Sequence, residues 1–226
     1  MSNKAKRYTC KREAVASTPY HKAIKLTPRT KAQKEYINLI YANELIFCTG
    51  SAGTGKTYIA TSLACKALEE KLVDRIILTR PAVTSGENFG YLPGELKDKY
   101  APYLEPFISI FHEHFGVSHT ENLISSGKIV AKPLAFMRGV TFSNSFIILD
   151  EAQNTTPEQM KLFLTRLGEG NKVIVDGDVE QKDIKVESGL SYAIRKLEHL
   201  PNIGVFTFGN ADCIRSELVK KILESW

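Results

Sequence analysis

The sequence predicts an α/β fold in which helices cover both faces of a mostly parallel sheet. Two observations support this class: short apolar runs recur along the chain, and helical patterns follow several of them. Apolar strands between amphipathic helices are typical of a parallel sheet that is buried on both faces. With 226 residues, the chain is long enough for one domain with a substantial core.

The expected elements alternate from residue 30 onward. The first is a helix over "TKAQKEYINLIYAN", in which Ile37, Ile40 and Tyr41 share one face, with Thr30 as its N-cap. Strands are expected at 45–48, 76–79, 129–130, 146–149, 173–175 and 205–208. Further helices are expected at 56–70, 156–167, 189–199 and 215–225. Ligands of such folds bind beyond the carboxyl ends of the strands, so a site is expected at that edge.

Residues 1–28 lack periodicity and are expected to form a basic, flexible arm before a single domain at 29–226. Residues 1–34 hold ten basic side chains and one acidic one, a net charge of +9, whereas the rest of the chain carries a net charge of −4. A basic arm on an acidic body indicates contact with polyphosphate, most simply a nucleic acid. A solvated tail explains the same charges equally well.

Residues 81–115 interrupt the alternation with a Gly/Pro-rich loop and an aromatic-rich helical stretch. The segment is too long for a simple connector, so we expect a functional insertion. Tyr103, Phe107 and Phe111 recur at helical spacing, which predicts a buried helix face. Phe89 and Tyr91 lie in the loop, where a functional role is expected.

Composition indicates a cytoplasmic protein without membrane contact. No apolar run approaches the roughly 20 residues that cross a bilayer, and the N-terminus lacks the apolar segment of a secretory signal. The four cysteines show no CxxC spacing. Cys48 and Cys65 lie in apolar segments and are therefore expected to be reduced core residues.

The stretch "LIFCTGSAGTGKTYIA" carries the pattern GxxxxGKT between an expected strand and an expected helix. Glycines let such a loop curl until backbone N–H groups point at phosphate oxygens, and the following helix adds its positive N-terminus. Lys56 is expected to reach the β- and γ-phosphates, and the Thr57 hydroxyl is expected to bind Mg²⁺. The expected nucleotide-binding residues here are Gly50, Ser51, Ala52, Gly53, Thr54, Gly55, Lys56, Thr57 and Tyr58.

The stretch "FIILDEAQNTT" ends a buried strand in two adjacent acids, Asp150 and Glu151. P-loop enzymes hold Mg²⁺ through a carboxylate at such a strand end, which assigns Asp150 to the metal. Glu151 is then placed to polarise a water molecule for in-line attack, which favours hydrolysis of the nucleotide. Helix capping explains one acid but not two, and Thr155 or Thr156 before Pro157 is the better cap.

A third expected strand end, "VIVDGDVEQKD", places Gly177, Asp178 and Gln181 in a short loop. If this strand lies beside the other two, the Gln181 amide can hydrogen-bond the γ-phosphate or the attacking water. An ordinary Asp-Gly turn is the alternative interpretation of the same residues.

Together, GSAGTGKT, LDEAQN and GDVEQ resemble motifs I, II and III of the superfamily 1 helicases. The similarity is closer to the PhoH-like ATPases, a phosphate-starvation-inducible family. It rests on "TRPAVTSGENFGYLPGELKDKYAPYLEPF", "PLAFMRGVTFSNSFIILDEAQNTTPEQMKLFLTRLGEG", "DGDVEQKD" with "SGL", and "DCIRSELVKKIL", and it covers about residue 29 to the C-terminus. In one departure, Ser216 and Glu217 follow Arg215 where the family usually has His-Pro.

The resemblance implies a RecA-like P-loop core that binds ATP and Mg²⁺ and acts on RNA or single-stranded nucleic acid. It also implies that Gln33 reads the adenine and that residues 79–83 touch single strands. The family further suggests hexamers.

One core lacks the second domain from which helicases take an arginine for the transferring phosphate, and an arginine in trans raises the rate by ~10³–10⁵ in P-loop enzymes. A homo-oligomeric ring, with a hexamer favoured, would supply one from each neighbour. Arg215 and Arg166 are the preferred candidates because each is expected near the nucleotide-facing edge, and Arg138 is a third. A surface salt bridge is an equally good explanation for any single one of them. Residues 81–115 could then line a pore and stack bases.

The expected function is that of a Mg²⁺-dependent, oligomeric, helicase-like ATPase that acts on RNA or single-stranded DNA. The alternative is a nucleotide-gated binding or assembly module in RNA metabolism or the phosphate-stress response, without translocation. A small-molecule kinase would need lid arginines, and no lid signature is present in the sequence.

Overall fold

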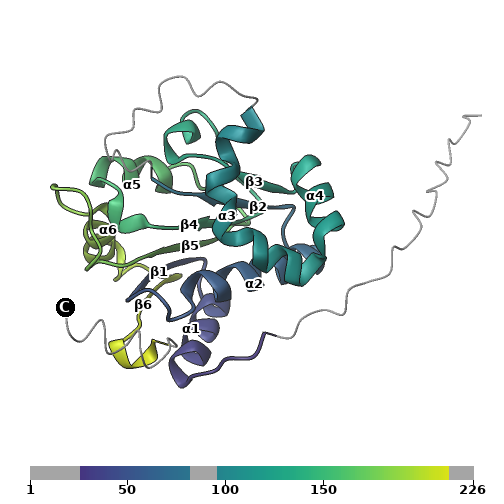
Figure 1. Ribbon diagram of the computed structural model, residues 1–226. Coiled ribbons are helices and arrows are strands. Elements are labelled where there is room, and N and C mark those ends of the chain that lie inside the picture. Colours follow the sequence, from purple (N-terminus) through teal and green to yellow (C-terminus); the bar gives the residue numbers. More distant parts are fainter. Residues whose placement is uncertain (1–25, 82–95, 214–226) are drawn as a thin grey trace, which may run out of the picture.

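The structure, a computed structural model, describes residues 26–81 and 96–213. Within these ranges, six strands form one sheet in the order β3-β2-β4-β5-β1-β6, and every pairing is parallel (Figure 1). The strands are β1 (Leu45–Thr49), β2 (Arg75–Thr79), β3 (Ile129–Ala131), β4 (Ser145–Leu149), β5 (Lys172–Gly177) and β6 (Ile203–Thr207). The α/β class, the parallel sheet and all six expected strands are confirmed.

Four of the five expected helices are confirmed, and the fifth, at 215–225, lies outside the described residues. The four are α1 (Lys31–Ala42), α2 (Lys56–Glu69), α5 (Pro157–Leu164) and α6 (Gly189–Leu197). Two more α-helices, α3 (Leu96–Phe115) and α4 (Val117–Ser125), follow β2. Short 3₁₀ helices occur at η1 (Leu134–Met137), η2 (Ala152–Asn154) and η3 (Asn210–Asp212).

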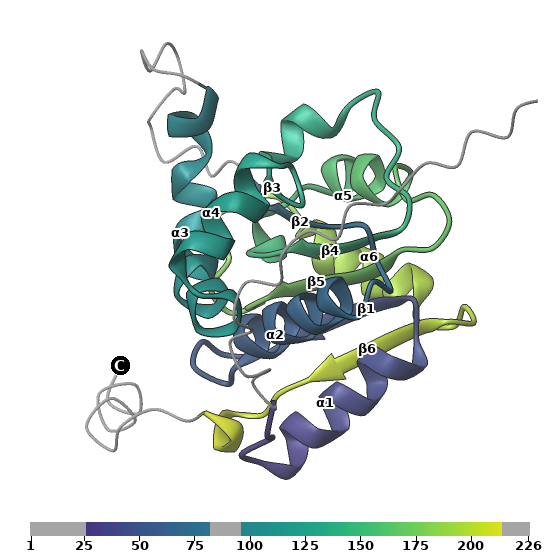
Figure 2. The ribbon, with the colours of Figure 1, turned by 90° about the vertical axis from the view of Figure 1, so that its right-hand side faces the viewer.

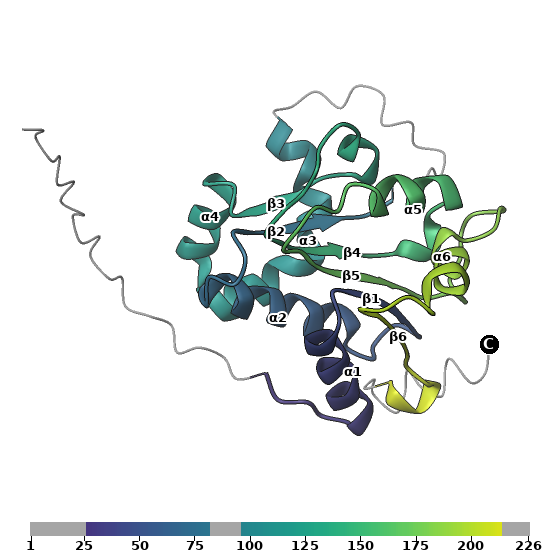
Figure 3. The same ribbon diagram turned by 180° about the vertical axis from the view of Figure 1, so that it is seen from behind.

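Helices cover both faces of the sheet, as the apolar strands require. Figure 2 shows α1, α2 and α3 on one side of the strands and α5 and α6 on the other. Each side has its own apolar core: one packs α1, α2 and α3 around Ile46, Ile148 and Ile174, and the other packs η1, α5 and α6 around Phe47 and Ile147. At the ends of the sheet, α4 lies against β3 and α1 against β6 (Figure 3).

The described part of the expected insertion belongs to the core. Helix α3 packs on α2, and its Phe107 and Phe111 are fully buried, which confirms the predicted buried face for these two residues. Phe89, Tyr91 and the side chain of Tyr103 lie outside the described residues.

The capping residues fix where two helices begin. The Thr30 side chain accepts a hydrogen bond from Gln33 N at 3.1 Å, so it caps α1 as predicted. At α5, Thr156 and Gln159 form a reciprocal capping box, with Pro157 at the first turn. Thr156 is therefore the cap, which leaves the two acids before it free for another role.

The strand order brings three loops to one edge of the sheet. Because β5 pairs in parallel with both β1 and β4, the carboxyl ends of these three strands lie side by side. The loop after β1 contains the GxxxxGKT pattern, β4 is followed by the adjacent acids, and β5 runs into the Asp-Gly turn. The expectation that the third strand lies beside the other two is confirmed.

Candidate nucleotide site

A pocket of about 240 Å³ opens where these three loops meet. The loop after β1 and the start of α2 contribute Ala52, Gly53, Gly55, Lys56, Thr57 and Tyr58 to its lining. The loops after β4 and β5 contribute Asp150, Glu151, Gly177, Asp178 and Gln181. Most of the residues predicted to bind nucleotide or metal thus share one pocket.

The loop after β1 needs glycine where it enters α2. Gly55, the N-cap of α2, has φ 90°, a left-handed conformation that favours glycine, and an added Cβ would lie 2.8 Å from Gln33 Nε2. The Thr54 hydroxyl donates to the Ser51 carbonyl at 3.1 Å and closes the loop on itself. The free N–H groups at the start of α2 make this end of the pocket attractive to anions.

Lys56 is held against its own loop. Its Nζ donates to the carbonyl oxygens of Gly50 at 2.6 Å and Ser51 at 3.0 Å, and the residue is only 9% exposed. Gly50 and Ser51 do not line the pocket themselves; they position the lysine that does. The ammonium group is therefore oriented inside the loop that would surround a phosphate.

Gln33 braces the same loop from α1. Its Nε2 donates to the Thr54 carbonyl at 3.0 Å, and its Oε1 accepts a hydrogen bond from Arg29 N at 2.8 Å. The side chain is buried and is not part of the pocket lining. The structure thus gives Gln33 a contact with the loop, and its predicted contact with adenine stays a prediction.

Asp150 is paired with an arginine from the neighbouring strand. Arg80, which follows β2, donates to Asp150 Oδ2 from Nε at 2.8 Å and also from Nη2, and its guanidinium lies 5.8 Å from the Phe107 ring centroid. Arg80 belongs to residues 79–83, which the family resemblance suggests touch single strands, and here its guanidinium pairs with the carboxylate of the predicted magnesium ligand. This contact joins the segment after β2 to the candidate metal site.

Glu151 has an unusual backbone. Its φ of 55° and ψ of 35° are left-handed, which is uncommon for a residue other than glycine and tends to occur at functional sites. Its backbone N–H donates to Asp150 Oδ1 at 3.0 Å, and its Oε2 accepts a hydrogen bond from Gln153 Nε2 at 2.6 Å. The carboxylate is therefore held in place where it lines the pocket.

Gln153 links the loops after β4 and β5. Its Nε2 also donates to the Gln181 carbonyl at 3.3 Å, and its Oε1 accepts from Asp178 N at 3.0 Å. A Cβ on Gly177 would lie 2.4 Å from the same Oε1, so only glycine permits this approach. One buried amide thereby sets the positions of both the acidic loop and the loop that carries Gln181.

The sequence predicts ATP hydrolysis in this pocket, and on that expectation Gln153→Ala should lower kcat by about 10–100-fold and leave ADP affinity unchanged, because small displacements of reacting groups are costly. Steady-state phosphate release and ADP titration would measure the two quantities. Gln159→Ala is the matched control, since that amide serves only the exposed capping box of α5. Equal kcat values for Gln153→Ala and the control would show that the amide does not position Glu151.

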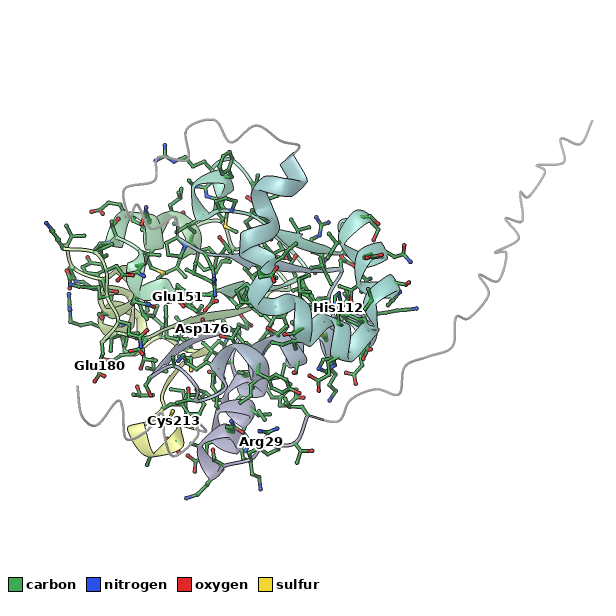
Figure 4. The ribbon with its side chains drawn as sticks, in the orientation of Figure 1. Arg29, His112, Glu151, Asp176, Glu180 and Cys213 are labelled. Atoms are coloured by element: carbon green, nitrogen blue, oxygen red, sulfur yellow. The ribbon has the colours of Figure 1, made fainter. Side chains whose placement is uncertain are left out.

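The sequence analysis missed a third acid, Asp176, in β5. Asp176 is fully buried, and neither carboxylate oxygen has a hydrogen-bond partner among the described residues. Burial, together with the neighbouring Asp150, raises the pKa of the Asp176 carboxyl well above its ordinary value, and in its protonated form it can donate to Asp150. An acid inside the apolar run "VIVDG" was the available signal. Figure 4 labels Asp176 and Glu151 at the same end of the sheet.

The three candidate arginines do not share one location. Arg166 follows α5, and its carbonyl accepts a hydrogen bond from the N–H of Phe142, which precedes β4. It therefore lies at the amino edge of the sheet, and the expectation that it lies near the nucleotide-facing edge is wrong. Arg138 is exposed after η1, and Arg215 lies outside the described residues.

Other sequence expectations concern cysteines, metals and membranes. Cys48, Cys65 and Cys213 are free and buried, whereas Cys10 lies outside the described residues. No group of three or more His, Cys, Asp or Glu residues in the described ranges could hold a metal by itself. No helix formed by these residues has the length and apolar character needed to cross a membrane.

We compared the sequence with family models and with curated proteins, and both comparisons identify the same family. The family model described as "PhoH-like protein" matches residues 25–226. A PhoH-like protein of Bacillus subtilis is 48% identical over 200 residues, which is 88% of this chain and 63% of the relative. Protein PhoH of Escherichia coli is 45% identical over 202 residues, or 88% and 57%. The chain therefore spans about three-fifths of the length of these relatives.

Two solved structures also align with most of this chain. The large terminase of a thermophilic bacteriophage aligns with 88% of this chain and 50% of its own at 13% identity and a TM-score of 0.49. The Pif1 helicase of Candida albicans aligns with 81% and 40% at 16% identity and a TM-score of 0.41. At TM-scores below 0.5, neither resemblance bears on the activity of this chain.

Proposed function

The chain belongs to the PhoH-like protein family, and from that premise we propose that it is a Mg²⁺-dependent ATPase that works as an oligomer on RNA or single-stranded nucleic acid. One observation carries the proposal. Lys56 and Thr57, the acids Asp150 and Glu151, and Gln181 come from three separate loops, and all of them line one pocket.

Each side chain has a role in this proposal that its position supports. The helix N-terminus at α2 and Lys56 bind the phosphates, and the lysine exchanges its loop carbonyls for phosphate oxygens. The Thr57 hydroxyl and the Asp150 carboxylate would hold Mg²⁺, since this ion prefers such hard oxygen ligands. Bound there, the ion would neutralise charge that develops on the phosphates.

Hydrolysis also needs an oriented water molecule. Glu151 is positioned by Gln153 and faces the same pocket as Lys56, so it is the proposed base that polarises this water. Gln181 lies on the adjoining loop, and its side-chain amide is the proposed contact to the γ-phosphate or the water. Gln153 bonds both loops, so a movement of Gln181 after loss of the γ-phosphate would shift the position of Glu151.

An arginine for the transferring phosphate is proposed to come from a second copy. The pocket lining within the described residues contains no arginine, and Arg80 is occupied by Asp150. Arg166 lies at the edge opposite its own pocket, which suits a head-to-tail ring in which one subunit's amino edge meets the next subunit's nucleotide. Arg215 remains the other candidate for this role.

The nucleic-acid partner is proposed from charge and from the family. The net charge of +9 in residues 1–34 favours a polyanion. Arg80 connects the segment proposed to touch single strands with the Asp150 carboxylate, so strand binding and metal binding can influence one another. The alternative, a nucleotide-gated assembly module, uses the same ATP site without such a partner.

Two measurements on the wild-type protein separate these functions. Single-stranded RNA or DNA at low salt is expected to bind and to raise the rate of phosphate release from ATP. Analytical ultracentrifugation with and without a non-hydrolysable ATP analogue is expected to show oligomers. If oligomers form with nucleotide but neither single-stranded RNA nor single-stranded DNA changes the ATPase rate, the assembly module is favoured. A monomer under all conditions would rule out the arginine in trans.

A further inference from the structure

Asp176 stands beside the predicted magnesium ligand in the sheet. Strands β4 and β5 pair Ile148 with Ile174 and Leu149 with Val175, and the next step of this register places Asp150 opposite Asp176. Side chains alternate along a strand, so both acids share a face with Ile148 and Ile174. That face packs against α1, α2 and α3. The two carboxylates are thus neighbours on the side of the sheet where α2 begins.

The Asp176 carboxylate is buried without the contacts that such groups normally have. Its exposure is 0%, and neither oxygen finds a donor among the residues that the structure describes. Of the charged groups near it, Lys56 is attractive, whereas Asp150 and Glu151 are repulsive. A buried polar group without a partner costs free energy, so its presence requires an explanation.

The first explanation to consider is purely structural. An apolar residue at this strand position would pack against Cys48, its partner on β1, at no cost in desolvation. A structural acid would instead be expected to accept hydrogen bonds from donors around it, as the buried Asp178 does from Glu180 N. Asp176 accepts none within the described ranges, and its protonated form can donate to Asp150, so its polar contact is with the predicted magnesium ligand and packing alone does not account for it.

We propose that Asp176 is the second acidic residue of the magnesium site, where it lies behind Asp150 and orients that carboxylate toward the ion. The inference rests on the proposed function, because it assumes the Mg²⁺–nucleotide complex. Asp176 is fully buried and does not line the pocket, so it has no contact with the ion or its water ligands. Asp176 is therefore a positioning residue that acts through Asp150.

Loss of such a positioning contact is expected to weaken metal binding by about 10–100-fold. Asp176→Val removes the carboxyl group, and valine suits a strand and is similar in size, so the fold is expected to persist. Asp176→Asn is the conservative variant, because its amide can donate to Asp150. Asp176→Val is expected to lose metal affinity, whereas Asp176→Asn is expected to keep it.

The experiment measures binding of Mn²⁺, as a paramagnetic substitute for Mg²⁺, to the wild-type protein and both variants in saturating ADP. Free Mn²⁺ is followed by electron paramagnetic resonance, and ADP affinity is measured separately in EDTA. The expected result is a roughly 10–100-fold higher Kd for Mn²⁺ in Asp176→Val, a Kd close to that of the wild-type protein in Asp176→Asn, and unchanged ADP affinity in EDTA for both. Circular dichroism in the absence of metal checks that each variant is folded.

Ser188→Ala is the matched control, because the Ser188 hydroxyl is also buried without a partner among the described residues but lies at the start of α6. A Kd for Mn²⁺ that is unchanged in folded Asp176→Val overturns the inference, as does an equal loss in Asp176→Asn or Ser188→Ala. If the wild-type protein binds no ADP, the proposed function fails, and this inference fails with it. If ADP binds and only the metal effect is missing, the proposed function stands.

Discussion

Glu151→Gln is expected to lower kcat for ATP hydrolysis by about 10²–10⁴-fold, the usual contribution of a general base. The amide keeps the size of the side chain and its contact with Gln153, but it cannot polarise water as a carboxylate does. Binding of ATP is expected to persist, because the proposed phosphate contacts are made by Lys56 and by the start of α2, which line the same pocket. Single-turnover phosphate release and equilibrium ATP titration measure these two properties separately.

The matched control for this variant is Glu180→Gln. Glu180 is exposed, lies on the loop after β5, and is not part of the pocket lining. Figure 4 shows it at the outer surface of the molecule, away from Glu151. An ATPase rate in Glu151→Gln that matches the rate of the control would remove Glu151 from the mechanism. Loss of ATP binding in the same variant would instead make the carboxylate a binding group.

Lys56→Ala is expected to reduce kcat by about 10²–10³-fold, the range seen when one donor to a developing anion is removed. ATP binding is expected to weaken as well, which distinguishes this variant from Glu151→Gln. The reason is that Lys56 is the only lysine or arginine that lines the pocket within the described residues. Titration with a fluorescent ATP analogue and phosphate-release kinetics measure the two effects.

Lys161→Ala serves as the control for Lys56→Ala because it removes the same charge from the exposed surface of α5. In the Lys56 variant, the carbonyls of Gly50 and Ser51 also lose their donor, so a change in loop order is expected beside the loss of charge. Thermal unfolding without nucleotide reports on that change. Undiminished ATP affinity in Lys56→Ala would contradict the assignment of the phosphate site.

The strands of the sheet could be predicted because the signal for each one, a short apolar run, is contained in a few consecutive residues. Each central strand is a short run of apolar residues, and the strand bounds differ from expectation by only a few residues. Helix α3 agrees with the aromatic-rich helical stretch expected within 81–115, and burial of Phe107 and Phe111 outweighs the low helix propensity of Pro102 and Pro106. Helix α4 was not predicted, because "VSHTENLIS" is largely polar.

Part of the candidate site could also be predicted from short stretches of consecutive residues. The loop after β1 and the acids after β4 form short motifs whose residue types follow from phosphate and metal chemistry. The contacts that tie the motifs together involve residues far apart in sequence, such as Arg80 with Asp150 and Gln153 with Gln181. Such pairs depend on strand order, which the motifs alone do not specify.

The most direct test of this account measures phosphate release from ATP by the wild-type protein at increasing protein concentration, with Mg²⁺ and with EDTA. We expect release that requires Mg²⁺ and a rate per subunit that rises with concentration as neighbouring copies complete the site. The Lys56→Ala protein provides the background. Phosphate release by the wild-type protein that never exceeds this background, with or without Mg²⁺, would contradict the proposal that this pocket hydrolyses ATP.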